Sequence, residues 1–170
     1  MFESLNVPIV TAVAGSGLVS AVVDMRTRRV PNPLTMGIAA IGLTFAATRL
    51  SDLTIAAAAL GFSVGLGLML LPYLFGAMGG GDLKLFAALG TFLGPRPTLQ
   101  AFLYTLLAGG VLAVAVAVQR RRFQETVQNA AELVTSGGAN APAIEHPTSN
   151  NRFAYAPAIA VGTLVAALGF

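Results

Sequence analysis

The sequence has no cysteine and only one histidine in 170 residues. Without cysteine the chain cannot form a disulfide bond, a cysteine-ligated zinc site or a thiol nucleophile. The single histidine, His146, argues against a histidine metal cluster and against a histidine-based catalytic triad. Charged residues are also scarce, at 10% of the chain, whereas soluble domains carry about 25%. So few charges could not cover the surface of a water-soluble fold of this size.

Apolar residues take the place of the missing charges. The chain is 55% hydrophobic, its mean hydropathy is +0.76, and apolar stretches recur near the roughly 17–25 residues that span a bilayer. We therefore predict an all-α fold, a polytopic bundle of about six transmembrane helices. The net charge of +3 is too small to indicate nucleic-acid binding, and we expect no nucleic-acid partner.

Six apolar segments can be distinguished in the sequence. They cover residues 7–24, 33–49, 53–76, 83–94, 99–118 and 153–170. The fourth is short and glycine-rich, so a half-buried segment is the alternative to a full span. A cleaved signal peptide is the alternative for the first, but no basic residue precedes it, which favours a retained helix.

The ten basic residues indicate the orientation of the bundle. With the N-terminus outside, the cytoplasmic side holds Arg26, Arg28, Arg29, Lys84, Arg120, Arg121, Arg122 and Arg152, and the outer side only Arg49 and Arg96. Cytoplasmic loops of membrane proteins carry the excess of Lys and Arg. We therefore predict that both termini lie outside. Without the fourth segment, residues 120–122 would also fall outside, which favours counting that segment as a span.

Residues 119–152 are the one long hydrophilic stretch in what we expect to be a single membrane-embedded domain, residues 1–170. Apolar positions recur at helical spacing in its first half, at Phe123, Val127, Ala130, Ala131 and Val134. This half is predicted to be a cytoplasmic amphipathic helix on the lipid surface, with a solvated continuation of the fifth helix as the alternative. The second half is rich in Gly, Pro, Ser and Asn, which indicates a flexible linker.

Two of the seven acidic residues lie at the ends of apolar segments. Asp24 ends the first segment, and Asp82 opens the fourth within the sequence GGGDLK. A carboxylate at the edge of hydrocarbon is costly and marks a candidate functional site. The predicted topology places both at the cytoplasmic face, at similar depth, so the two helix ends could meet.

Two facing carboxyl groups can share one proton, because like charges in contact do not both ionise easily. One then acts as a base towards water, while the other, protonated, polarises a carbonyl group. Arg26 and Lys84 each follow an aspartate by two positions, where a cation would help to keep one negative charge on the pair. The alternative is that both cations are only membrane anchors.

Three glycines precede Asp82. Gly79, Gly80 and Gly81 would allow backbone conformations closed to other residues and the close approach of another chain, and a plain turn between helices is the alternative. The spacing of a phosphate-binding loop is absent. The two aspartates could instead hold Mg²⁺, but the sequence offers no third ligand near either one. We expect neither a metal centre nor a cofactor.

Three segments of the sequence resemble motifs of the type IV prepilin peptidases, which are intramembrane aspartyl peptidases of the GxGD type. Residues 24–32, DMRTRRVPN, are similar to the family's D-x-R-x-x-x-[IV]-P-N segment. Residues 79–84, GGGDLK, resemble its G-x-G-D-x-K motif. Residues 155–160, YAPAIA, resemble its aromatic-small-Pro-Ala-[IL]-Ala element. The three segments stand in the family's order across most of the chain.

The resemblance implies an aspartic endopeptidase of the bacterial cytoplasmic membrane, with Asp24 and Asp82 as the catalytic pair facing the cytoplasm. Its partners would be prepilins or pseudopilins, cut between a short basic leader and the apolar helix that follows, beside membrane lipid. The matching motif positions that would support the site are Arg26, Pro31, Asn32, Gly79, Gly81, Lys84 and Pro157.

Larger members of that family carry a cysteine-rich, zinc-binding region between their first helices and also methylate the new N-terminus. This chain has no cysteine and only a short loop at that place. It therefore resembles the short form associated with Flp/Tad pili, and we expect cleavage without N-methylation. Pilus assembly and type II secretion both stay open as the pathway served, as does the oligomeric state.

Two other functions also stay open. One is a different GxGD intramembrane protease acting on another class of membrane protein, against which the Pro31-Asn32 element argues. The other is a non-enzymatic membrane scaffold or a small transporter, in which the two acids would line an ion path.

The predicted orientation can be tested because the chain has no cysteine. A single Thr27→Cys variant should resist a membrane-impermeant thiol reagent in intact cells and react after the cells are opened. Labelling of Thr27→Cys in intact cells would contradict the orientation, and with it the cytoplasmic placement of the acids.

Overall fold

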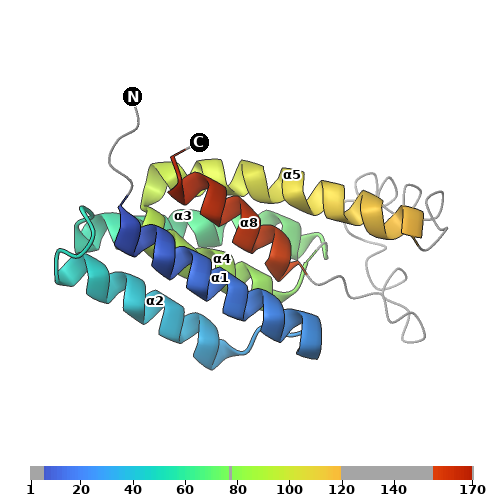
Figure 1. Ribbon diagram of the computed structural model, residues 1–170, viewed down its shortest axis with the longest axis horizontal. Coiled ribbons are helices and arrows are strands. Elements are labelled where there is room, and N and C mark those ends of the chain that lie inside the picture. Colours follow the sequence, from blue (N-terminus) through green and yellow to red (C-terminus); the bar gives the residue numbers. More distant parts are fainter. Residues whose placement is uncertain (1–5, 77, 120–154, 170) are drawn as a thin grey trace.

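The computed structural model describes residues 6–76, 78–119 and 155–169, and every regular element in these ranges is a helix (Figure 1). The helices are α1 (Val7–Thr27), α2 (Asn32–Ala47), α3 (Ile55–Leu74), α4 (Gly80–Leu93), α5 (Pro95–Gln119) and α8 (Ala156–Ala167). The predicted all-α bundle of six apolar segments is confirmed. The amphipathic helix and linker predicted for residues 119–152 lie outside the described residues, except for the end of α5.

The six helices differ in how they can relate to a bilayer. By length and composition, α1, α3 and α5 can cross a membrane, and α2 and α8 are shorter apolar helices. The fourth, α4, has 14 residues, which rise only about 21 Å, less than the roughly 30 Å of bilayer hydrocarbon. It contacts each of the other five described helices, and nearly all of its side chains are buried. The other helices therefore surround α4, and protein rather than lipid contacts most of its surface.

Contacts between distant residues identify the two ends of the bundle. At one end, Asn6 Nδ2 donates a hydrogen bond to the Asp52 carboxylate at 3.1 Å. At the other end, Gly81 lies against Val30, and Asp24 reaches the start of α8. The first residues of α1 and the last residues of α8 lie at the same end (Figure 1). The chain therefore runs back and forth between the two ends, and α4 makes one of these passages.

Glycines allow the helices to cross closely. A Cβ atom on Gly61 of α3 would overlap the carbonyl oxygen of Gly90 in α4, and one on Gly90 would overlap the carbonyl oxygen of Gly61. A Cβ atom on Gly162 of α8 would likewise overlap Thr105 of α5. Small residues at such crossings let backbones come into contact, which is how helices commonly associate inside membranes. The bundle around α4 is held together by backbone-to-backbone packing at these points.

The crossing of α3 and α4 predicts a difference between two glycines of α3. Gly61→Ala should lower the thermal unfolding temperature of the purified protein by several degrees, because overpacking a core typically costs about 1–3 kcal/mol. Gly67→Ala is the matched control, since a Cβ atom there would meet nothing within 4 Å. A thermal melt in detergent compares the two, and equal unfolding temperatures would contradict the crossing.

Candidate active site

Asp24 lies near the end of α1 and is buried, with 5% of its surface exposed. Its Oδ2 atom accepts a hydrogen bond from the backbone N–H of Ala156, at the first residue of α8, over 3.2 Å. Its carbonyl oxygen accepts from the N–H of Arg28, which ends the helix in the left-handed conformation at φ 53°. The chain therefore turns away at Arg28, about one helical turn after Asp24, and the Asp24 carboxyl group faces the start of α8.

Asp82 lies in the first turn of α4, and 8% of its surface is exposed. The N–H of Gly79, the residue that caps the helix, donates a hydrogen bond to its carboxyl group. A carboxylate is also favoured at this position by the positive end of the helix dipole. Within the described residues, however, the buried Oδ1 atom has no hydrogen-bond partner. A buried polar atom of this kind is rare in proteins.

The two carboxyl groups lie at the same end of the bundle, close enough for their charges to interact. They come from helices that run in opposite directions, α1 ending and α4 beginning at this end. Asp52, by contrast, is exposed and bonded to Asn6 at the opposite end. Among the acids of the described residues, Asp24 and Asp82 are therefore the buried pair.

The sequence suggested two roles for the three glycines before Asp82, which were unusual backbone conformations and close approach. None of them has a positive φ angle, so the expectation of conformations closed to other residues is wrong. Gly80 and Gly81 are already part of α4, and helical geometry suits any residue. A close approach does occur within the chain itself, because a Cβ atom on Gly81 would lie 3.1–3.2 Å from the N, O and Cβ atoms of Val30. The expected approach of another chain stays a prediction. Gly81 thus lets the loop after α1 rest on the start of α4.

A second contact joins the same two segments. Lys84 Nζ donates a hydrogen bond to Asn32 Oδ1 at 2.9 Å, linking α4 to the first residue of α2. Lys84 is thus bonded to Asn32 and forms no ion pair with either aspartate within the described residues. Arg26 is exposed, as is Pro31, the residue that caps α2. Both expected cations are therefore exposed, and Lys84 makes a hydrogen bond between α4 and α2.

Three residues of this region were not among the site residues expected from sequence. Val30 is buried and supplies the backbone on which Gly81 rests. Tyr155 and Ala156 precede the expected Pro157, which is the second residue of α8. All three lie inside the motifs quoted above, but they act through main-chain atoms or through packing contacts. The motifs therefore located the right segments of the sequence. The contacts in the structure were needed to identify these three residues within them.

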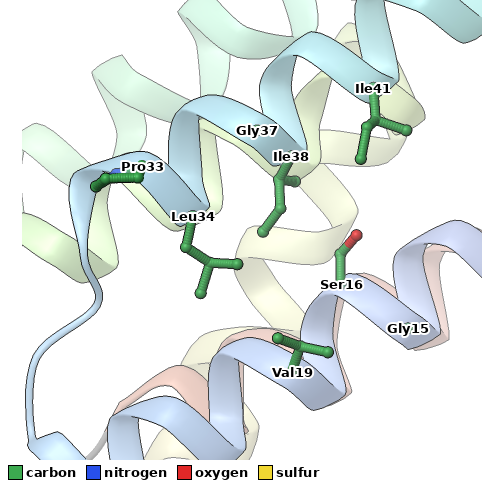
Figure 2. Close-up of a pocket in the computed structure, with 8 residues that line it drawn as sticks. All are labelled: Gly15, Ser16, Val19, Pro33, Leu34, Gly37, Ile38 and Ile41. Carbon is green, nitrogen blue, oxygen red and sulfur yellow. The ribbon is translucent and has the colours of Figure 1, made fainter.

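An apolar cleft of about 340 Å³ lies between α1 and α2. Figure 2 shows the side chains of Leu34, Ile38 and Ile41 from α2 and those of Ser16 and Val19 from α1 around this space. The lining residues are Gly15, Ser16, Val19, Pro33, Leu34, Gly37, Ile38 and Ile41, and none is charged. Pro33 directly follows Asn32, and Val19 lies little more than one helical turn before Asp24. The cleft therefore runs along both helices towards the aspartate end.

The chemistry available at this end is that of two carboxyl groups. In the described part of the chain, no group of three His, Cys, Asp or Glu residues is placed to hold a metal ion. Two neighbouring carboxyl groups do not both ionise easily, so one proton shared between them provides an acid and a base together. The unpartnered Asp82 Oδ1 atom leaves a position at which a reacting group could bind.

The fold and the site define a helical membrane protein with a pair of buried carboxyl groups at one end of its bundle. The chain belongs to the type IV leader peptidase family, whose model matches residues 11–114, more than half of the sequence. The match contains both aspartates and ends before the start of α8. No curated protein and no solved structure matched the chain. The protein is accordingly a membrane protease of the leader peptidase type.

Proposed function

We propose that this protein removes the short basic leader from prepilins or pseudopilins at the cytoplasmic face of the bacterial cytoplasmic membrane. Asp24 and Asp82 act as an aspartyl pair, without a metal ion. The observation that carries the proposal is the burial of these two carboxyl groups together at one end of a helical membrane bundle, in a chain of the leader peptidase family.

The reaction follows from one proton shared by the pair. One carboxylate takes a proton from a water molecule as the water oxygen bonds to the scissile carbonyl carbon. The other carboxyl group gives its proton to the carbonyl oxygen, which yields a tetrahedral diol. The diol returns a proton to the pair as the C–N bond breaks, and its electron pair stays on nitrogen. The nitrogen then takes a proton from the pair, which again holds one proton.

The shape of the protein beside the aspartates supports a substrate that is itself embedded in the membrane. In a prepilin, an apolar helix continues from the bond that is cut. The cleft between α1 and α2 offers an apolar surface free of charged side chains, and it leads to the end of the bundle that holds Asp24. The basic residues of the sequence favour placing this end in the cytoplasm, where the leader lies.

The paired mechanism predicts that neither aspartate can be replaced. Asp24→Asn and Asp82→Asn keep the side-chain shape but remove the base or the acid, so each should lower leader removal by at least about 100-fold. The double variant should be no worse than either single one, since residues that act as a unit are not additive. Cleavage of a co-expressed prepilin, scored by immunoblot at matched enzyme levels, measures all three.

Asp52→Asn is the control for these variants, because Asp52 lies at the opposite end of the bundle. It should retain close to wild-type cleavage. Asp24→Asn and Asp82→Asn should still accumulate in the membrane, since each removes a costly charge from the edge of hydrocarbon. Substantial cleavage by either Asp24→Asn or Asp82→Asn would rule out the pair and favour the scaffold or transporter instead.

The product should carry an unmodified N-terminus. The chain has no cysteine, and only residues 28–31 separate α1 from α2, so a cysteine-rich region between the first helices is absent. Mass spectrometry of a mature pilin made with this enzyme alone should therefore show a free amino group. A methylated N-terminus in that experiment would refute this part of the proposal.

A further inference from the structure

The start of α8 is the third segment at the aspartate end of the bundle. Ala156 is fully buried, and its N–H donates to Asp24 Oδ2 over 3.2 Å, although 132 positions separate the two residues. The preceding residue, Tyr155, lies close enough to Asp82 for its phenol and the carboxylate to interact electrostatically. One dipeptide therefore bonds to Asp24 and lies within electrostatic range of Asp82.

The position of Tyr155 depends on a glycine of α5. A Cβ atom on Gly109 would lie 2.5 Å from the Tyr155 hydroxyl oxygen and 2.7 Å from its Cζ atom, closer than real Cβ contacts. Gly109 is buried, whereas its neighbour Gly110 is exposed, and a Cβ atom on Gly110 would meet nothing within 4 Å. The ring of Tyr155 thus rests on the bare backbone of α5 at Gly109.

We propose that Tyr155 is a positioning residue of the active site. Its ring, seated on Gly109, fixes the start of α8 so that the Ala156 N–H holds the Asp24 carboxyl group beside Asp82. This inference rests on the proposed function and adds a third chain segment to its machinery.

The geometry explains why such a tether matters. Two carboxyl groups share a proton only while they face one another. Within the described residues, Asp24 Oδ2 accepts its hydrogen bond from the start of α8. If α8 shifted, the Asp24 side chain could rotate away from Asp82. Burial, and to a lesser degree the negative charge of Asp82, raise the pKa of the Tyr155 phenol. The phenol therefore stays neutral at neutral pH and adds no charge next to the pair.

The adjacent glycines of α5 provide the test. Gly109→Ala should push the Tyr155 ring from its seat and lower kcat for leader removal about 10- to 100-fold, because displacing a reacting group by about 1 Å can cost 100-fold. KM should stay within about twofold, since the substrate surface is untouched. Gly110→Ala, one position along the same helix, should match the wild type in both constants.

A double-mutant cycle separates positioning from a general effect on packing. Tyr155→Ala should lower kcat about tenfold, and Tyr155→Phe, which keeps the ring, should remain close to the wild type. In the Tyr155→Ala background, Gly109→Ala should cost nothing further, because the ring that it displaces is gone. If Gly109→Ala fails to accumulate, the comparison of Tyr155→Ala with Tyr155→Phe decides.

The outcomes distinguish this inference from the proposed function. Cleavage by the wild type together with equal kcat for Gly109→Ala and Gly110→Ala would overturn the positioning role and leave the peptidase intact. Additive losses in the double variant, or equal losses for Tyr155→Ala and Tyr155→Phe, would overturn it as well. No cleavage of any prepilin by the wild-type chain would overturn the proposed function and the inference with it.

Discussion

Helix α4 is too short to cross a bilayer by itself, so its polar ends have to be covered by the helices around it. The packing of α4 against α3 meets this need, because Gly61 and Gly90 bring the two backbones into direct contact. The depth of Asp82 follows from this packing, since Asp82 lies in the first turn of α4. The site thus depends on α4, and neighbouring helices rather than lipid hold α4 in place.

The aspartate end is assembled mainly by main-chain contacts. Val30 rests on Gly81, and the Ala156 N–H bonds to Asp24. Contacts of this kind leave little freedom of position, because a backbone moves only when its whole helix moves. They also compensate part of the cost of burying carboxyl groups at the edge of hydrocarbon, since a hydrogen-bonded carboxylate is cheaper to bury than a bare one.

The leader peptidase family is recognised here over residues 11–114, which include most of α1, all of α2 to α4 and most of α5. The start of α8 lies beyond that range, yet it touches Asp24 directly. In this chain the site therefore draws on a helix outside the matched region. The small side chains of α5 and α8, such as Gly109 and Gly162, are what allow α8 to reach the aspartates from there.

The helical membrane class, the six apolar segments and the two candidate aspartates could all be predicted from the sequence. Hydrophobic length and scarce charge are properties of each segment alone, and a carboxylate beside an apolar run is visible in one dimension. These features need no knowledge of which helix lies beside which.

The packing of the helices could not be predicted from the sequence and is known from the three-dimensional structure. It placed α4 inside the bundle and bonded Lys84 to Asn32. It showed that Gly80 and Gly81 are helical residues and that Gly81 permits a close approach. It also brought Tyr155 and Ala156 to the aspartates across most of the chain. Such contacts join backbone atoms and glycines of distant segments, and the same short motif is compatible with many pairings. The packing of the other five helices around α4 therefore determines which segments contact one another.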